Sequence, residues 1–446
     1  MISKVVLNNS NGPVNHLSHK PLEKPNMLYP AKMNGMSILR VVLLLALVSL
    51  SQSFSIVVPG ATWISKSSTS MMVASRKMKD AEGSTSPYSR RDLLDVTGKA
   101  LTAAILGTVI PANAANAEVP TATKTILLTG GNSGIGFQAA LRLANEGHTL
   151  VIPCRTLEKS IRAVKTLESL VAGAKCIPAE CDLADLTSIS AFAKDLPSLI
   201  GTGTKLDTVC FNAGLARDAG AKDITRTIDG FELTVGTNHL GHFSLHHQLL
   251  PMLHPSGRIV ITASGVHDPE SPGGAQGKTA TLGNLEGLER DGVSFEMVDG
   301  QPFNADKAYK DSKLCNVLFT RELQQKLRTS EVYKNISVNC FNPGLIVSTG
   351  LFRDQNPFFT KIFDLAATDL LKVGETPEWG GSALAYMTYI DSKGLYYSSA
   401  PGSSKYGDAA FGNQFHVVTP SIEAQNDKIA KKLWTLSEKL VGIQSA

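Results

Sequence analysis

Tyr309 and Lys313 lie four residues apart, and together they can transfer a proton. On a helix this spacing places both side chains on one face. A free tyrosine has a pKa near ~10 and is a poor proton shuttle at neutral pH. A neighbouring ammonium favours the phenolate and lowers that pKa. The pair therefore predicts a phenol that exchanges a proton with a bound substrate.

A glycine-rich segment, Thr-Gly-Gly-Asn-Ser-Gly-Ile-Gly, occupies residues 129–136. Its glycines allow a tight turn and the close approach of a phosphate to the backbone. A helix that begins there offers free N–H groups and a positive dipole end. The segment lies between a predicted strand and a predicted helix, which is the context of a dinucleotide-binding loop. We expect contacts with the cofactor from Gly130, Asn132, Ser133, Gly134, Ile135 and Gly136.

The second predicted strand ends in Pro153-Cys154-Arg155. NAD enzymes usually carry an acidic residue there, which holds the ribose hydroxyls. A guanidinium instead attracts a 2′-phosphate through charge-assisted hydrogen bonds. Arg155 therefore favours NADPH as the cofactor, although an ordinary solvated surface charge would look the same in the sequence.

Strand and helix patterns alternate from residue 124 onward, without repeats or an internal linker. This alternation predicts an α/β fold: a single-domain, Rossmann-type, doubly wound parallel sheet with helices on both faces. The predicted strands cover 124–129, 148–153, 175–178, 207–211, 258–262, 337–341 and 395–397. The predicted helices cover 135–145, 158–171, 230–253 and 306–329, with further helices towards the C-terminus.

Residues 1–118 are expected to be a targeting leader, and residues 119–446 the folded domain. The leader holds 12 Lys+Arg against 6 Asp+Glu, whereas the remainder holds 31 against 33, so no basic excess indicates nucleic acid. The apolar run 41–50 after Arg40 has the shape of a signal peptide, and 55–79 lacks acidic residues like a transit peptide. Arg90-Arg91 precedes an apolar stretch, as in a twin-arginine signal. Together these segments predict a plastid protein, at the thylakoid membrane, in the lumen or in the stroma.

The six cysteines and the histidines at 239, 242, 246 and 247 show no spacing typical of zinc ligands, and we predict no metal site. The cysteines are expected to be reduced and buried. The four histidines are expected to pack along their helix.

Further segments resemble the short-chain dehydrogenase/reductase superfamily, and the resemblance implies a role for each. Asp182 and Leu183 would lie beside the adenine, although Asp182 could equally be a helix N-cap. Asn238 would hold a water for proton relay, and Ser264 would hydrogen-bond the substrate carbonyl. The Asn-Ala-Gly segment would pack against the cofactor, and the loop after the sixth strand would fix the nicotinamide amide. These two segments comprise Asn212, Ala213 and Gly214, and Pro343, Gly344, Ile346 and Ser348.

Within that superfamily, residues 235–243, 308–316, 349–353 and 437–442 look like the light-dependent protochlorophyllide reductases, as does the long insertion between Ser264 and Tyr309. The resemblance covers about residues 124–442. It implies that the small-molecule substrate is a tetrapyrrole, one ring double bond of which is reduced. NADPH would give the hydride, Tyr309 the proton, and light would drive the step.

Two other functions fit the same residues. The family has a cysteine at the position of Leu345 and commonly a threonine at that of Ser264, so this chain also resembles carbonyl reductases and retinol dehydrogenases. A light-independent oxidoreductase of an apolar plastid carbonyl compound is the first alternative. A non-catalytic, NADPH-binding pigment scaffold is the second, although a scaffold has no use for a tuned phenol. The sequence leaves the oligomeric state open.

Overall fold

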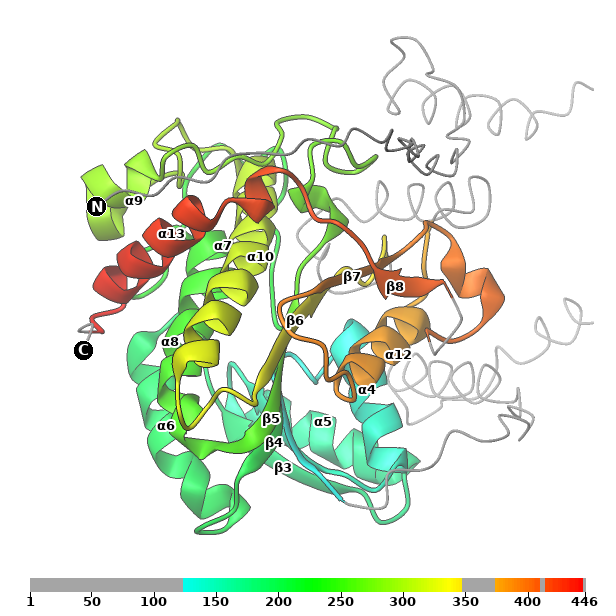
Figure 1. Cartoon of the computed structure of the whole chain (residues 1–446). Coiled ribbons are helices and arrows are strands. Elements are labelled where there is room, and N and C mark those ends of the chain that lie inside the picture. The colour runs from blue at the N-terminus through cyan, green and yellow to red at the C-terminus, as the bar shows by residue number, and fades with distance from the viewer. Residues whose placement is uncertain (1–122, 347–373, 410–413, 444–446) are drawn as a thin grey trace, which may run out of the picture. The chain divides into compact units, whose positions relative to one another are not determined.

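The computed structural model describes residues 123–346, 374–409 and 414–443 (Figure 1). The leader segments and Ser348 lie outside the described residues. Among the residues that are described, no helix is both long enough and apolar enough to cross a membrane.

The described strands form one sheet in the order β3-β2-β1-β4-β5-β6-β7-β8. The sheet is parallel from β3 to β7, as the alternation of strands and helices predicts, but β8 is antiparallel to β7. The predicted doubly wound parallel sheet is therefore confirmed, and β8, which was not predicted, is a strand of three residues that returns beside β7 at the edge. The strands are β1 Thr125–Leu128, β2 Thr149–Cys154, β3 Lys175–Glu180, β4 Leu206–Phe211, β5 Leu253–Thr262, β6 Ser337–Phe341, β7 Tyr396–Ser399 and β8 Phe415–Val417.

Helices cover both faces of the sheet (Figure 1). Central strands are apolar on both sides because each face packs against helices; Ile126, Leu127 and Leu128 of β1 are all fully buried. Two hydrophobic cores result, one on each face. One core includes α4 Gly134–Asn145, α5 Leu157–Leu170 and α12 Pro377–Met387. The other includes α6 Leu186–Ile200, α8 Gly241–Leu249, α10 Ala305–Thr329 and α13 Asp427–Leu440.

The helix expected over 230–253 is not continuous. It consists of α7 Leu233–Val235, a π-helical turn Gly236–Leu240, α8 and a 3-10 turn Leu250–Met252, and Leu253 already belongs to β5. A Cβ atom on Gly241 would lie 2.3 Å from the carbonyl oxygen of Leu183. The glycine thus allows this segment to pack directly against the loop after β3. Single π-turns of this kind are frequent beside functional sites.

Two buried lysines attach the 265–305 insertion, which contains the short α9 Glu286–Asp291, to α10. Lys307 Nζ lies 2.9 Å from Asp299 Oδ2 and 2.5 Å from Asp311 Oδ2, and it donates to the Thr281 carbonyl at 2.7 Å. Lys310 Nζ donates to the Lys278 carbonyl at 3.0 Å. The insertion is therefore fixed to the helix that carries Tyr309.

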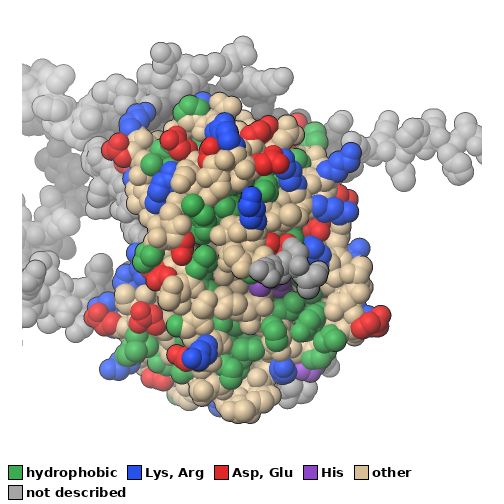
Figure 2. Space-filling view, turned by 90° about the vertical axis from the view of Figure 1, so that its left-hand side faces the viewer, with side chains coloured by type: hydrophobic (Ala, Val, Ile, Leu, Met, Phe, Trp, Pro, Cys, Tyr) green, Lys and Arg blue, Asp and Glu red, His purple; other side chains and the backbone are tan. Residues whose placement is uncertain are grey.

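The described surface carries charges of both signs. On the face shown in Figure 2, basic and acidic side chains are interspersed among apolar ones. This agrees with the near balance of charge outside the leader.

Candidate active site

A cavity of ≈590 Å³ opens at the carboxyl ends of the parallel strands, where open α/β sheets bind their ligands. The described site residues expected from the sequence line it, apart from Asn238. They come from the loops after β1, β2, β3, β4, β5 and β6, and from α10. They are Gly130, Asn132, Ser133, Gly134, Ile135, Gly136, Arg155, Asp182, Leu183, Asn212, Ala213, Gly214, Ser264, Tyr309, Lys313, Pro343, Gly344 and Ile346.

Side chains would not fit at the glycine positions of the glycine loop. Gly130 and Gly134 have φ angles of 70° and 54°, a region that favours glycine. A Cβ atom on Gly136 would lie 2.2 Å from the carbonyl oxygen of Gly130. Ser133 is the N-cap of α4, yet its side chain forms no cap hydrogen bond. The first N–H groups of α4 and the Ser133 hydroxyl are therefore available to a pyrophosphate.

A cationic group lies at the end of the cavity near β2. Arg155 is 49% exposed at its side chain, and its Nε lies 3.8 Å from Oδ1 of Asp182. That carboxylate accepts the backbone N–H of Ala184 at 3.0 Å, and the N-cap of α6 is Asp185 instead. Lys159, in the first turn of α5, also lines the cavity and was not expected from the sequence. Two cations at this end suit a 2′-phosphate.

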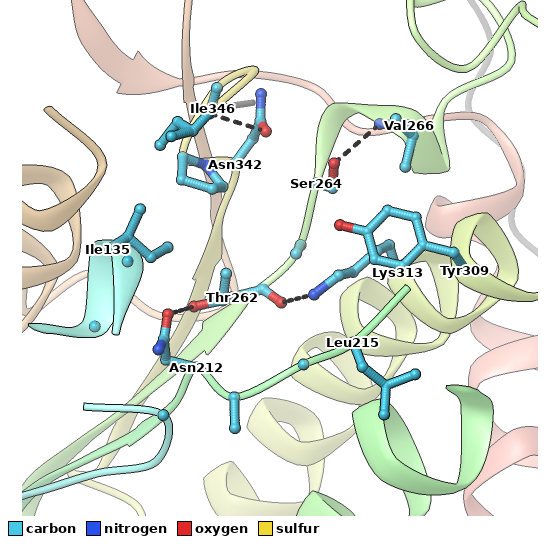
Figure 3. Close-up of a pocket in the computed structure, with 18 of the residues that line it drawn as sticks. Ile135, Asn212, Leu215, Thr262, Ser264, Val266, Tyr309, Lys313, Asn342 and Ile346 are labelled. Carbon is cyan, nitrogen blue, oxygen red and sulfur yellow. Dashed lines mark hydrogen bonds between the residues drawn. The ribbon is translucent and has the colours of Figure 1, made fainter. Parts of the chain in front are cut away.

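The reacting end is formed by α10 and the end of β5. In Figure 3 the Tyr309 hydroxyl points towards Ser264, and Lys313 extends beside the tyrosine ring. Lys313 Nζ lies 5.6 Å from that ring's centroid and donates to the Thr262 carbonyl at 3.1 Å. Ser264 Oγ accepts the Val266 N–H at 3.4 Å. The proton-transfer pair Tyr309 and Lys313 and the expected carbonyl-binding Ser264 therefore share one wall of the cavity.

The expected lowering of the tyrosine pKa is wrong for this arrangement. Burial raises the pKa of Tyr309 above its ordinary value, and a side-chain hydrogen bond with Ser264 opposes this only in part. Burial also lowers the pKa of Lys313 to about 8. Tyr309 is therefore a protonated phenol at neutral pH, which suits donation of a proton to a substrate.

Asn238 is buried behind the cavity. Its Nδ2 donates to the Leu215 carbonyl at 2.9 Å and to Ser312 Oγ at 3.0 Å, and its Oδ1 accepts the Leu215 N–H at 2.9 Å. The amide thus joins the π-turn, the loop after β4 and α10. Both N–H groups of the amide are used by these bonds, and the fully buried side chain does not line the cavity, so it is not in position to hold a relay water there.

Two threonines shape the site without having been expected from the sequence. Thr129 Oγ1 accepts the N–H groups of Asn212 at 2.9 Å and of Ala213 at 3.0 Å. Thr262 Oγ1 donates to Asn212 Oδ1 at 3.2 Å. They could have been predicted from the sequence, because each is the residue at the end of a predicted strand, the first and the fifth.

Comparison with known proteins identifies the class. The family model of the short chain dehydrogenases matches residues 124–276. Protochlorophyllide reductase B of Hordeum vulgare is 35% identical over 357 residues, which cover 75% of this chain and 86% of that protein. The corresponding protein of Oryza sativa subsp. japonica is 36% identical over 327 residues, covering 72% and 77%. The crystal structure of an uncharacterised protein from Mycobacterium paratuberculosis superposes with a TM-score of 0.50 at 26% identity, covering 72% of this chain and 95% of that chain.

The chain therefore belongs to the short-chain dehydrogenase/reductase superfamily and, within it, to the protochlorophyllide reductase family. It is an NADP-dependent oxidoreductase that uses NADPH as its cofactor. The residues present fit this cofactor, because a side chain at Gly136 would fill the phosphate cradle and Arg155 stands where an acidic residue would repel a 2′-phosphate.

Proposed function

We propose that this protein is a plastid enzyme that reduces one ring double bond of protochlorophyllide in a light-dependent step. The main observation behind the proposal is that Ser264, Tyr309 and Lys313 lie together on one wall of the cavity that the glycine loop also lines. Similarity to relatives named protochlorophyllide reductase supports the choice of substrate. Their names also describe those relatives as chloroplastic, which agrees with a plastid address in the proposed leader, residues 1–118.

Each side chain at the reacting end has a separate role in the proposed reaction. NADPH, when bound, supplies a hydride to one carbon of the double bond. Tyr309 holds the proton that the other carbon needs, because burial keeps the phenol protonated. Ser264, towards which that hydroxyl points, partly offsets the rise in its pKa. Lys313, anchored on the Thr262 carbonyl, places positive charge beside the phenolate that forms when the proton leaves.

The cavity suits an apolar substrate. Leu215, Val266, Pro272, Leu345 and Pro401 are among the residues that line it. Contact with such a lining removes apolar area from water, which favours binding at about 25 cal/mol per Å². Desolvation also strengthens the interactions of Tyr309 and Lys313 with a bound substrate.

The test is a paired assay of purified protein with NADPH and protochlorophyllide, one sample in darkness and one illuminated. We expect the pigment's absorption to change to that of the reduced product only under light. The Tyr309→Phe variant is the matched control. Illuminated protein that leaves the pigment unchanged would contradict the proposal.

A light-independent carbonyl reductase is the second candidate. Leu345, rather than a cysteine, lines the cavity, and Ser264 is hydrogen-bonded to Tyr309 as a carbonyl-binding serine would be. This function predicts NADPH oxidation in darkness with a panel of apolar ketones and aldehydes. Turnover in that panel together with no light-dependent pigment reduction would decide for it.

A further inference from the structure

His242 lies in the first turn of α8, between the glycine loop and the segment that carries Asn238. The residue is only 2% exposed, and its ring packs against Phe211 with centroids 5.1 Å apart. Nδ1 lies 3.1 Å from the Asn238 carbonyl oxygen, and Nε2 lies 3.0 Å from Thr129 Oγ1. One ring nitrogen is thus within hydrogen-bond distance of the residue before the glycine loop, and the other is within hydrogen-bond distance of the π-turn that contains Asn238.

The protons in this group can be placed in one way. A carbonyl oxygen only accepts, so Nδ1 carries the proton that reaches Asn238. Burial lowers the pKa of His242 to about 4, so the ring is neutral at physiological pH and Nε2 has a free lone pair. Nε2 is therefore an acceptor, and the Thr129 hydroxyl must be its donor.

The other bonds of Thr129 agree with this placement. Its Oγ1 uses both lone pairs to accept the N–H groups of Asn212 and Ala213, which leaves one proton to donate. The Cys210 carbonyl is a second possible acceptor, 3.2 Å from Oγ1, but it accepts the Thr129 N–H at 3.1 Å and so stays paired when the hydroxyl donates to His242. Donation to His242 thus leaves every group in the cluster paired.

Each end of the imidazole leads to one half of the site. Thr129 directly precedes Gly130, so its hydroxyl fixes the start of the phosphate loop. On the other side, Asn238 donates to Ser312 Oγ, and Ser312 Oγ donates to the Tyr309 carbonyl at 2.7 Å. His242, acting through Asn238 and Ser312, therefore connects the cofactor loop with the turn of α10 that carries the phenol.

We propose that His242 is a positioning residue that holds the cofactor loop and the proton-donating helix in register with each other. A neutral imidazole is suited to this because it donates at one atom and accepts at another across the ring. Asparagine reproduces only the Nδ1 position, and glutamine only the Nε2 position. The proposal rests on the proposed roles of Tyr309 and the glycine loop.

The test uses two variants of the full chain that each keep one half of the link. His242→Asn keeps the donor to Asn238 and removes the bond from the Thr129 hydroxyl to α8, leaving that hydroxyl with the Cys210 carbonyl as its acceptor. We expect its Kd for NADPH to rise about three- to tenfold while kcat changes less, since loss of a hydrogen bond costs roughly 0.5–1.5 kcal/mol. His242→Gln leaves the Asn238 carbonyl without its donor, and kcat should fall about tenfold while Kd changes less. The Kd is measured without substrate by quenching of protein fluorescence, so this result stands even if the assignment of the substrate fails.

His246→Gln is the matched control. His246 lies one turn further along α8, is equally buried, and packs against Phe319 with centroids 5.7 Å apart. Its replacement should leave both Kd and kcat within about twofold, because the ring packs against Phe319 and Trp434, neither of which lines the cavity. If the His242 variants match His246→Gln in both constants, the proposal is overturned.

Variants of Thr129 keep the proposal testable if the His242 variants do not fold. Thr129→Val has nearly the same shape and should raise Kd, whereas Thr129→Ser keeps the hydroxyl and should bind more tightly than Thr129→Val. Where both single variants fold, Thr129→Val combined with His242→Asn should bind NADPH no worse than Thr129→Val alone. Thr129→Val that binds as tightly as the unaltered chain, or effects that multiply in the double variant, would overturn the coupling.

Discussion

At the scale of single residues, burial sets the protonation of the two groups at the reacting centre. It raises the pKa of Tyr309 and lowers that of Lys313 to about 8, because the desolvation of a charged form is costly for each. The phenol is therefore held as a proton donor. Its neighbour is a cation that loses its proton in the mildly alkaline range.

Removal of the Tyr309 hydroxyl should stop the reaction and leave the cofactor in place. In Tyr309→Phe we expect turnover to fall by about 10² to 10⁴-fold, the range for loss of a general acid. The Kd for NADPH should stay within about twofold, since the dinucleotide loop is untouched. Turnover rates and fluorescence titration check the two arms, and turnover near that of the unaltered chain would exclude Tyr309 as the donor.

The buried Lys313 should reduce stability in the absence of ligand. Its folded pKa of about 8 is lower than the ordinary 10.5, so the folded state carries the full penalty below pH 8 and loses it as the pH rises towards 10.5. That shift corresponds to at most roughly 3 kcal/mol. Lys313→Met should therefore raise the free energy of unfolding at pH 7, and the gain should shrink above pH 8.

Denaturant titration at pH 7 and pH 10 checks this expectation. The Thr262 carbonyl stays paired in the variant because Asn316 Nδ2 also donates to it at 3.1 Å. The same variant should lose turnover. A variant that is less stable than the unaltered chain at pH 7 would show that Lys313 is compensated by contacts beyond the Thr262 bond.

The functional residues could be predicted from the sequence where their residue type is unusual for its place in a strand, loop or helix. The glycines, Arg155, Tyr309 and Lys313 were expected, and they line one cavity. The direction of the Tyr309 pKa was not, because burial depends on the fold and the sequence shows only the neighbouring ammonium. The hydrogen bond between Thr129 and His242 likewise joins residues 113 positions apart in the sequence.

At the scale of elements, the site depends on how strands and helices end. Parallel strands bring their carboxyl ends to one edge, so loops from distant parts of the chain meet there. Most of the α-helices that the structure describes are capped by a side chain; Asn426, for example, accepts the N–H groups of Lys428 and Ile429 at 3.0 and 3.2 Å. The Ser133 side chain at the start of α4 forms no such bond, so its expected role is to bind the cofactor phosphate and not to cap the helix.

The difference between Ser133 and Asn426 predicts opposite effects of their replacement on affinity and stability. Ser133→Ala should weaken NADPH binding several-fold and leave the free energy of unfolding unchanged, because no cap bond is lost. Asn426→Ala should lower that free energy by about 1 kcal/mol, the typical cost of a lost N-cap, and leave the affinity unchanged. Denaturant titration and NADPH titration of both variants provide the measurement. Loss of stability in Ser133→Ala without loss of affinity would contradict the phosphate role.

The elements themselves were predictable where their hydrophobic pattern is strong. Strands β1, β2, β4 and β6 and helix α10 agree with the expected ranges within one or two residues at each end. Helix α6 was missed because Pro197 lies inside it, and proline in a helical pattern usually indicates a break. The π-turn was missed because the hydrophobic pattern does not encode it; it is followed by Gly241, which packs directly against Leu183.

At the scale of the whole molecule, the basic charge lies in the proposed leader and the described domain is close to neutral. A leader that serves only as an address has no part in the fold. Removal of residues 1–118 should therefore leave the Kd for NADPH within about twofold. The same residues fused to a fluorescent protein should deliver it to plastids in a plastid-bearing cell. A truncated chain that cannot bind NADPH would show that the leader contributes to the domain.

The account as a whole is tested most directly by isotope transfer in a single illuminated turnover. NADPH carrying deuterium at the transferable position of its nicotinamide ring is bound with protochlorophyllide in darkness, and the pigment is analysed by mass spectrometry after a flash. The account predicts a product heavier by one deuterium from the cofactor, with a second arising only in heavy water, and none of either in Tyr309→Phe. A product of the unaltered chain that lacks the cofactor's deuterium, or no product after the flash, would contradict it.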